Sequence, residues 1–376
     1  MRFIHSADWQ IGKVFKQFGE REEPLRQARL AAIERLGEFA KKNGAAHILV
    51  AGDLYDSETP TPVSLRAPIE RMKLFPDIAW HLLPGNHDPH RPEGVWDRLA
   101  RMGLPSHIHP LLTPEIAPLG DSAFLLPAPL VRKTEHDDIS MWMDAAATPA
   151  GALRIGMAHG SVVDFGNEGE AVNPIDPARA TKAGLDDFAL GDWHGTQQVG
   201  PKTWYAGTPE PDRAGRQERG TALLVDIAGA GATPIVTPLA TGTYRWLSRR
   251  ERFVDGSELE PFEQRFRSEP DLSHLVLRLQ LEGTLPVAHY AELEARLMDF
   301  AAAAFHLQVD RSALAVRPTA ADLEAIDFDG VLRRSADHLQ SLIGDPTQTP
   351  EMRHRAQEAL VELYIHVVRS ARKEAA

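Results

Sequence analysis

Apolar segments alternate with amphipathic segments along the first part of the chain. Residues 2–7 and 47–51 are short apolar runs typical of buried strands, and residues 22–43 between them repeat apolar side chains at helical spacing. A third apolar run at 78–83 follows another helical stretch. This order of strand and helix predicts an α/β domain.

Further strand patterns continue to about residue 240, where we expect the first domain to end. Beyond it, alternating apolar positions at 275–281 and a helical pattern over 288–304 predict a small α+β unit. The remaining pattern is helical, with a break at 345–350. The chain is therefore expected to have three parts, which we place at 1–240, 241–320 and 321–376.

Oxygen and imidazole side chains follow the carboxyl ends of successive predicted strands. Open α/β sheets place their ligand sites at these ends, so the loops are expected to converge on one crevice. Hard and borderline divalent cations bind such side chains, and a carboxylate shared by two ions fits a centre that activates phosphate and water. The candidates are Asp8, Gln10, Asp53, Asn86, His87, Asp88, His159, Asp192 and His194.

Composition and charge narrow the chemistry further. The chain has 41 Lys and Arg against 53 Asp and Glu, a formal net charge of −12, so any contact with nucleic acid has to be local or supplied by metal ions. The absence of cysteine excludes disulfides, thiolate metal sites and a cysteine nucleophile. There is no signal-peptide pattern and no run of about 18 apolar residues, so we expect a cytoplasmic protein without membrane association.

The order and spacing of the strand-end motifs resemble the calcineurin-like metallophosphoesterase family, and within it the SbcD-type DNA-repair nucleases. The resemblance covers residues 1–240. It implies a four-layer α/β/β/α sandwich, a small α+β domain that caps the DNA, and C-terminal helices. The motifs that carry it are Gly-Asp-Leu-Tyr-Asp at 52–56, Gly-Asn-His-Asp at 85–88, His159 with Gly160, Gly-Asp-Trp-His-Gly at 191–195 and Tyr-Ala-Gly-Thr-Pro-Glu at 205–210.

The resemblance also assigns two divalent metal ions to this site. Asp8 and His194 would hold the first ion, and Asn86 and His159 would hold the second. Asp53 would bridge the two ions.

Two residues of the Gly-Asn-His-Asp motif are expected to act in catalysis. His87 would stabilise the charge that develops on the phosphate or protonate the departing oxygen. Asp88 would accept a hydrogen bond from the other ring nitrogen of His87 and so fix its tautomer.

Two positions depart from the family pattern, which shows Asp-x-His at the first motif and Gly-His-x-His at the last. Here Gln10 and Asp192 replace imidazole with oxygen ligands, and Gln10 reaches its ion either directly or through water. With Asp192 bound, the centre becomes harder, which favours Mn²⁺ over softer ions, while Mg²⁺, Fe²⁺ and Zn²⁺ stay open as alternatives. The alternative is that these replacements leave an inactive site.

Three functions remain open at this point. The first is a metal-dependent DNA phosphodiesterase that acts on single strands or DNA ends in repair. The second is a metallophosphatase or small-molecule phosphodiesterase, and the third is a catalytically impaired DNA-binding subunit. Trp9, Trp96 and Trp193 could stack on unpaired bases. Basic residues close in sequence to the metal loops could follow a phosphodiester backbone, although solvated surface charge explains them equally well, and the densest basic run, at 245–252, lies where a cap would face the groove.

The resemblance implies DNA and an SbcC-like ATPase as partners. The final helical segment, 350–376, carries an apolar stripe that could dock such a partner or pack on its own protein instead. A homodimer is also compatible with the sequence.

Overall fold

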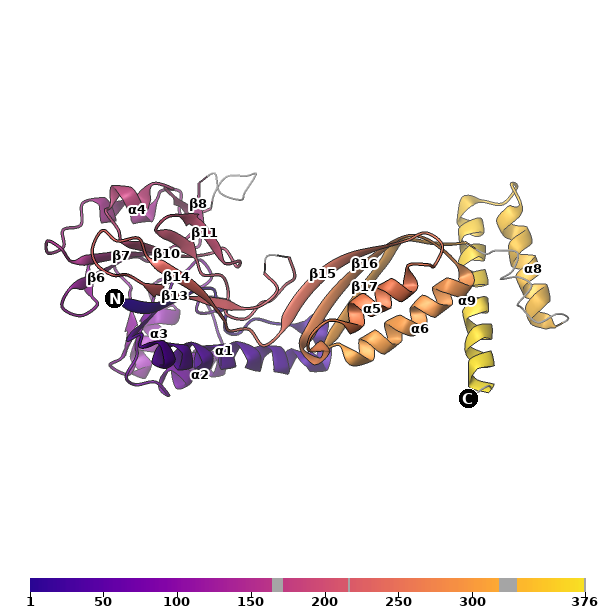
Figure 1. Cartoon of the computed structure of the whole chain (residues 1–376), viewed down its shortest axis with the longest axis horizontal. Helices are drawn as coiled ribbons and strands as arrows, with labels where there is room; N and C mark the ends of the chain where they lie inside the picture. The colour runs from indigo at the N-terminus through magenta and orange to yellow at the C-terminus, as the bar shows by residue number, and fades with distance from the viewer. Residues whose placement is uncertain (164–171, 216, 318–329, 375–376) are drawn as a thin grey trace. The chain divides into compact units, whose positions relative to one another are not determined.

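The computed structural model describes residues 1–163, 172–215, 217–317 and 330–374. The chain divides into two compact units, Met1–Trp246 and Leu247–Ala376. It has an α/β fold with mixed sheets and C-terminal helices (Figure 1). None of the helices in the described ranges combines the length and apolar character needed to cross a membrane.

The first unit contains two mixed six-stranded sheets. The first sheet has the order β14-β13-β1-β2-β3-β4, with β14 (Ile235–Ala240), β13 (Thr221–Asp226), β1 (Arg2–Ser6), β2 (His47–Val50), β3 (Ala79–Leu82) and β4 (Ile108–Pro110). The second has the order β11-β12-β10-β7-β6-β5, with β11 (Gln197–Gly200), β12 (Thr203–Tyr205), β10 (Asp187–Gly191), β7 (Leu153–His159), β6 (Ala123–Ala128) and β5 (Ala117–Pro118). Two short strands, β8 (Ser161–Val162) and β9 (Pro174–Ile175), form a separate two-stranded sheet.

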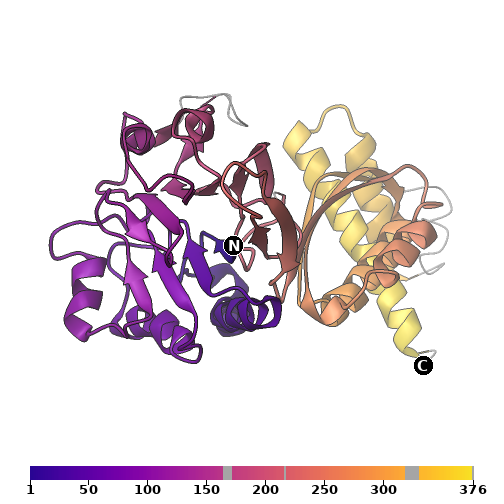
Figure 2. The same cartoon turned by 60° about the vertical axis from the view of Figure 1, so that its left-hand side comes forward.

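Three apolar cores hold these sheets and their helices together. Leu49 on β2 belongs to the core between the sheets, whereas its neighbours Ile48 and Val50 belong to the core shared with α1, α2 and α3. This division follows from the two-residue period of a strand. Met143 and Phe188 belong to a third core with α4 and η2. Figure 2 shows the same unit from another side. Its helices are η1 (Lys16–Arg21), α1 (Glu22–Asn43), α2 (Pro62–Met72), α3 (Val95–Met102), η2 (Ile139–Asp144) and α4 (Arg179–Lys182).

The parallel strands of both sheets direct their carboxyl ends toward the loops that carry the candidate residues. In the first sheet β1, β2 and β3 are parallel, with Ser6 opposite Val50 and Val50 opposite Leu82. In the second sheet β7 and β10 are parallel, with His159 opposite Gly191. Because the last residues of these parallel strands are paired with one another, the residues that follow the strands lie at one edge of each sheet.

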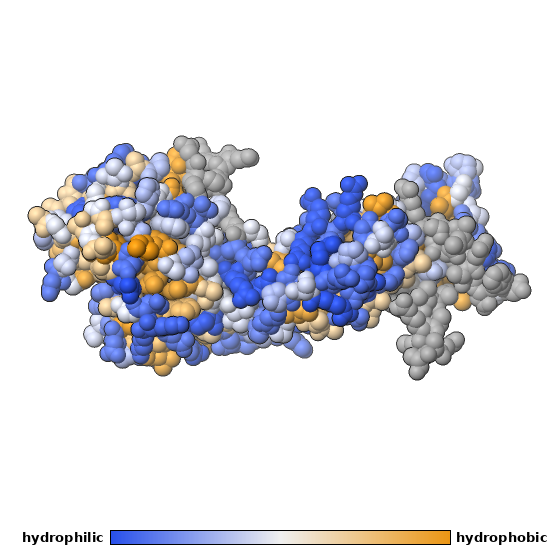
Figure 3. Space-filling model, in the orientation of Figure 1, coloured by the Kyte–Doolittle hydropathy of each residue, from blue (hydrophilic) through white to orange (hydrophobic). Residues whose placement is uncertain are grey.

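The second unit is a three-stranded sheet with helices. The helices α5 and α6 share one apolar core with the sheet, which includes Leu277, Phe262 and Phe300. In the view of Figure 3, hydrophilic side chains gather over β15 and α5. The elements are β15 (Arg245–Phe253), α5 (Leu259–Arg267), η3 (Leu272–His274), β16 (Leu275–Pro286), α6 (Val287–Ala303), β17 (His306–Arg317), α8 (Val331–Gly344) and α9 (Pro350–Glu374).

The last two helices pack against each other and against α6. Leu360 and Tyr364 on α9 share a core with Ala336 on α8 and Val287 on α6, and Leu363 packs at its margin. This part of the apolar stripe is therefore used within the chain. The predicted start of the helical segment at 321 lies outside the described residues.

Candidate metal centre

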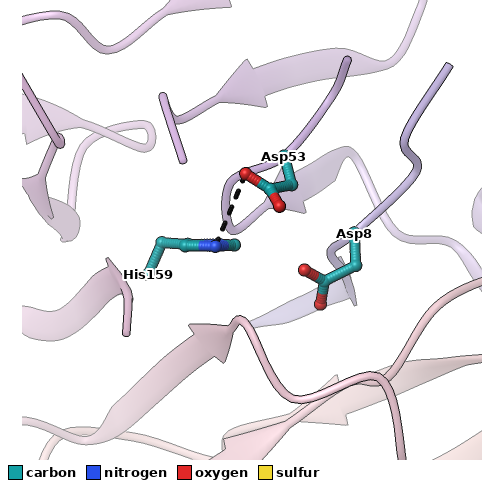
Figure 4. Close-up of side chains that lie close together, drawn as sticks. All are labelled: Asp8, Asp53 and His159. Carbon is teal, nitrogen blue, oxygen red and sulfur yellow. Dashed lines mark ion pairs between the residues drawn. The ribbon is translucent and has the colours of Figure 1, made fainter. Parts of the chain in front are cut away.

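Three buried side chains converge where the two sheets of the first unit present their parallel strand ends. Asp8 follows β1, Asp53 follows β2 and His159 ends β7, and their side chains are at most 2% exposed. One ligand atom from each lies within 4.8 Å of the others. Figure 4 shows the two carboxylates and the imidazole turned toward one another. This arrangement is a metal-binding Asp/His cluster.

The backbone is strained at the residues that build the centre. Asp8 (φ 54°), Gln10 (φ 45°), Asp53 (φ 54°) and Asp192 (φ 99°) all have positive φ angles, which side-chain-bearing residues adopt rarely. Such conformations persist where the surrounding structure imposes them, and they concentrate at functional sites. At this centre, the positive φ angles direct the side chains that follow the strands toward one shared space.

Two glycines allow the loops of the centre to lie close to the neighbouring ligand side chains. A Cβ atom at Gly52 would overlap the His159 ring, and one at Gly85 would overlap the Asp53 carboxylate. Gly52 also has a φ of +93°, which disfavours any other residue. These positions explain the glycines that open the 52–56 and 85–88 motifs.

The His159 side of the centre has open ligand atoms. His159 Nδ1 lies 2.9 Å from the Ala51 carbonyl oxygen and donates to it, so Nε2 is the ring nitrogen that faces the centre. Within the described ranges, His159 Nε2 and Asn86 Oδ1 are buried without a hydrogen-bond partner. His159 Nε2 lies 3.5 Å from Asp53 Oδ1 and 3.9 Å from Asp192 Oδ1. Buried polar atoms left without partners fit a bound cation.

The Asp8 side is more crowded. His194 Nε2 lies 4.0 Å from Asp8 Oδ1 and 3.2 Å from Gln10 Nε2. The other ring nitrogen of His194, Nδ1, lies 3.5 Å from Asp212 Oδ1. Lys13 Nζ contacts both Gln10 Oε1 and Asp212 Oδ2.

Asp212 was missed by the sequence reasoning. Burial opposes its ionisation, but contact with His194 and the charges of Arg29 and Lys13 hold the pKa of Asp212 well below its usual range. The one available signal was its place two residues after the Tyr-Ala-Gly-Thr-Pro-Glu motif. Nothing in the local pattern connects it with a histidine at 194.

His87 lies at the rim, but the predicted hydrogen bond from its ring to Asp88 is wrong. His87 Nδ1 instead donates to the Asp56 carbonyl oxygen at 2.9 Å. The Asp88 carboxylate is fully buried and accepts the backbone N–H groups of Gly85 and Tyr55. Asp88 thus ties the two motif loops together, and a backbone carbonyl fixes the histidine tautomer.

The charges within the centre perturb one another. Burial raises the pKa of Asp8 to about 6, although the nearby histidines oppose this rise. Burial also raises the pKa of Asp88 to about 7. For His159 burial acts in the opposite direction, but the carboxylates of Asp53 and its neighbours outweigh it and raise the pKa to about 9. The cluster therefore has an excess of negative charge that a cation would neutralise.

Two of the three tryptophans considered for base stacking cannot reach a ligand. Trp9 and Trp96 are 1% exposed, and their indole N–H groups donate to Ser6 Oγ and to the Asp88 carbonyl oxygen. Trp193 is half-buried and packs at the margin of the core that contains Phe188. The interpretation of Trp9 and Trp96 as stacking platforms is wrong because their rings fill the interior.

Comparison with known proteins agrees with the chemistry of this cluster. Residues 1–172 match the family described as calcineurin-like phosphoesterase. Residues 1–172 are therefore a calcineurin-like metallophosphoesterase region, and the buried Asp/His cluster that they contain is typical of that family.

Among individual proteins, the chain is 28% identical over 292 residues to the SbcD subunit of nuclease SbcCD from Rhodobacter capsulatus, covering 64% of this chain and 69% of that protein. It is 26% identical over 114 residues to the DNA double-strand break repair protein Mre11 of Methanopyrus kandleri, covering 29% of this chain and 24% of that protein. These similarities are distant homology to the SbcD and Mre11 nucleases. A crystal structure of TT1561 from Thermus thermophilus aligns with a TM-score of 0.41 and 10% identity, over 64% of this chain and 98% of that one.

Proposed function

We propose that the protein is a metal-dependent DNA phosphodiesterase that cleaves single-stranded DNA or DNA ends in repair. The observation that carries this proposal is the similarity to the SbcCD nuclease subunit, which covers 64% of this chain and 69% of that protein, more of the chain than the 1–172 family match. A nuclease relative matched over so much of the chain favours a phosphodiester substrate over a phosphomonoester.

The donor atoms of the centre fit two divalent ions. Asn86, His159 and Asp192 would hold one ion, Asp8 and His194 would hold the other, and Asp53 would bridge them. Such ions supply Lewis acidity toward a phosphodiester and lower the pKa of a water molecule. Three carboxylates among these residues make the site hard, which supports Mn²⁺ as the expected ion.

His87 is proposed as the general acid or as a stabiliser of developing charge. Because Nδ1 donates to the Asp56 carbonyl, the second ring nitrogen, Nε2, is free to hold or transfer a proton. Nε2 lies 3.9 Å from Asp53 Oδ2, so it faces the centre. An imidazole held in this way is suited to protonate a departing alkoxide.

DNA recognition by the second unit is part of the same proposal. We retain the division into a catalytic domain at 1–240 in a four-layer sandwich, a capping domain at 241–320 and a helical segment at 321–376. The basic run contributes less free charge than its sequence indicates, because Arg245, Arg249 and Arg250 pair with Glu218, Glu269 and Glu282. An SbcC-like ATPase partner follows from the same distant similarity.

A comparison of substrates tests the proposed reaction. Purified protein with Mn²⁺ is incubated with a labelled single-stranded oligonucleotide, with p-nitrophenyl phosphate and with bis-p-nitrophenyl phosphate. We expect hydrolysis of the oligonucleotide and of the bis-ester, and little of the monoester. Turnover of the monoester alone would establish a phosphatase, and binding of the oligonucleotide without cleavage would establish a DNA-binding subunit.

Metal dependence tests the ion assignment. We expect activity with Mn²⁺ to exceed activity with Zn²⁺, because the carboxylate-rich donor set favours a harder cation. Metal-free protein is supplied with each ion in turn and assayed on the same oligonucleotide. Full activity with Zn²⁺ and none with Mn²⁺ would contradict the assignment.

A further inference from the structure

Lys13 fixes the orientation of the Gln10 amide. Its Nζ lies 3.0 Å from Gln10 Oε1, 3.3 Å from Asp56 Oδ1 and 2.8 Å from Asp212 Oδ2. An ammonium group has only donors, so the amide atom that faces it has to be the oxygen. The pairing with Asp212, whose side chain is 6% exposed, holds the ammonium in place.

This orientation turns the Gln10 nitrogen toward the site. Gln10 Nε2 lies 3.2 Å from His194 Nε2, where an amide N–H donates to the ring lone pair. An amide nitrogen has no lone pair suited to a metal, and the His194 nitrogen that faces Asp8 is already engaged. On the opposite side of the ring, Asp212 Oδ1 lies 3.5 Å from His194 Nδ1, within ion-pair distance.

On the His159 side of the centre, by contrast, ligand atoms are open to an ion. Asn86 Oδ1 and His159 Nε2 are buried without a hydrogen-bond partner in the part of the chain that is described, so both are available to an ion. Asp192 keeps one oxygen turned toward His159, because Ser161 Oγ donates to the other oxygen at 2.8 Å. An ion on this side displaces no protein hydrogen bond from Asn86 Oδ1 or His159 Nε2.

We propose that Lys13 and Asp212 are positioning residues that make the two metal sites unequal. The site of Asp53, Asn86, His159 and Asp192 fills first and tightly. The site of Asp8 and His194 fills second and weakly, because Lys13 directs the Gln10 oxygen away and the incoming ion has to displace the Gln10 N–H from His194. This inference rests on the metal centre of the proposed function and adds the order of filling.

A titration of metal-free protein with Mn²⁺ alone tests it, with free Mn²⁺ measured by electron paramagnetic resonance. The wild type is expected to bind two ions with dissociation constants that differ by about 10- to 100-fold, the range by which outer partners change metal affinity. Lys13→Met frees the Gln10 oxygen and should narrow this difference to a few-fold. Lys16→Met, which removes an exposed ammonium nearby, is the matched control and should keep the wild-type difference.

Two further variants test the roles of Gln10 and Asp212 separately. Gln10→His supplies a lone pair in place of the amide N–H and should tighten the weak site while leaving the strong site unchanged. Asp212→Asn removes the carboxylate that holds the Lys13 ammonium and should, like Lys13→Met, narrow the difference between the two dissociation constants. Circular dichroism checks that each variant is folded before titration.

Two equal Mn²⁺ sites in the wild type would overturn the inference, as would a Lys13→Met titration identical to that of Lys16→Met. These outcomes are independent of the nuclease assay. Equal sites in a protein that cleaves DNA would refute only the order of filling, whereas unequal sites in a protein that leaves DNA intact would refute only the proposed reaction.

Discussion

His87 and Asp53 lie next to each other at the centre but have different roles. The side chain of His87 is 36% exposed. Its ring donates a hydrogen bond to the carbonyl oxygen of Asp56, which is not one of the proposed metal ligands. Asp53 is 2% exposed and accepts the backbone N–H of His87 on Oδ1. Removal of each side chain should therefore have separable effects.

We expect His87→Ala to bind Mn²⁺ like the wild type and to lose about 10²- to 10⁴-fold in turnover, the usual contribution of a general acid. Asp53→Ala should lose metal and activity together. Elemental analysis after dialysis and the oligonucleotide assay measure the two effects. His136→Ala, at a histidine outside the site, serves as the control, and loss of metal in the His87 variant would refute its role as the acid.

At the scale of elements, three neighbouring parallel strands carry a row of histidines. His47 on β2 and His81 on β3 have ring nitrogens 3.1 Å apart, and the rings of His81 and His109 on β4 stack with centroids 5.1 Å apart. Burial and the neighbouring imidazoles lower the pKa of all three, that of His81 to about 3. Over the described residues, no carboxylate forms an ion pair with this row.

This row should make the first unit sensitive to acid. The folded pKa of His81 is below the unfolded value of 6.5, so the unfolded chain takes up the proton first as the pH falls and stability decreases below pH 6.5. Between pH 6.5 and 5 this single group costs about 2 kcal/mol of unfolding free energy.

Urea unfolding at pH 7.5 and pH 5.0 measures the effect. His81→Leu removes the titrating group and should reduce the difference between the two pH values, and His136→Leu should leave that difference unchanged. An equal pH dependence in wild type and His81→Leu would show that other groups govern acid sensitivity.

At the scale of the molecule, the buried carboxylates of the centre connect metal binding with folding. Burial raises the pKa of both Asp8 and Asp88, and the charge of Asp53 adds to both rises, so a cation at the centre would relieve repulsion between the carboxylates. A ligand that binds only the folded state stabilises it in proportion to the logarithm of its concentration.

Saturating Mn²⁺ should therefore raise the melting temperature of the first unit by about 5–10 °C over EDTA-treated protein. Differential scanning calorimetry measures the melting temperature of both samples. Asp53→Ala should show no such increase, and a melting temperature unchanged by Mn²⁺ in the wild type would argue against a site built from these carboxylates.

Much of the fold could be predicted because the signals are local. The helix expected at 22–43 is α1, the strand expected at 47–51 is β2 with one residue fewer, and the helix expected at 288–304 is α6 with its bounds shifted by one residue. Each follows from the repeat of apolar side chains over a few turns or a few strand positions. The polar residues at the strand ends were likewise visible without coordinates.

Contacts between distant segments could not be predicted in this way. The sequence by itself determined the class of protein and the set of side chains at the strand ends. This was possible because secondary-structure periods and motif spacing depend only on residues that are close together in the sequence. Only the tertiary structure decided that Asp56 and not Asp88 holds His87, that Trp9 and Trp96 are interior, and that Lys13 and Asp212 surround Gln10 and His194. The physical reason is that these contacts depend on the register of the sheets and on the strained loops between them, which bring together residues up to about 200 positions apart.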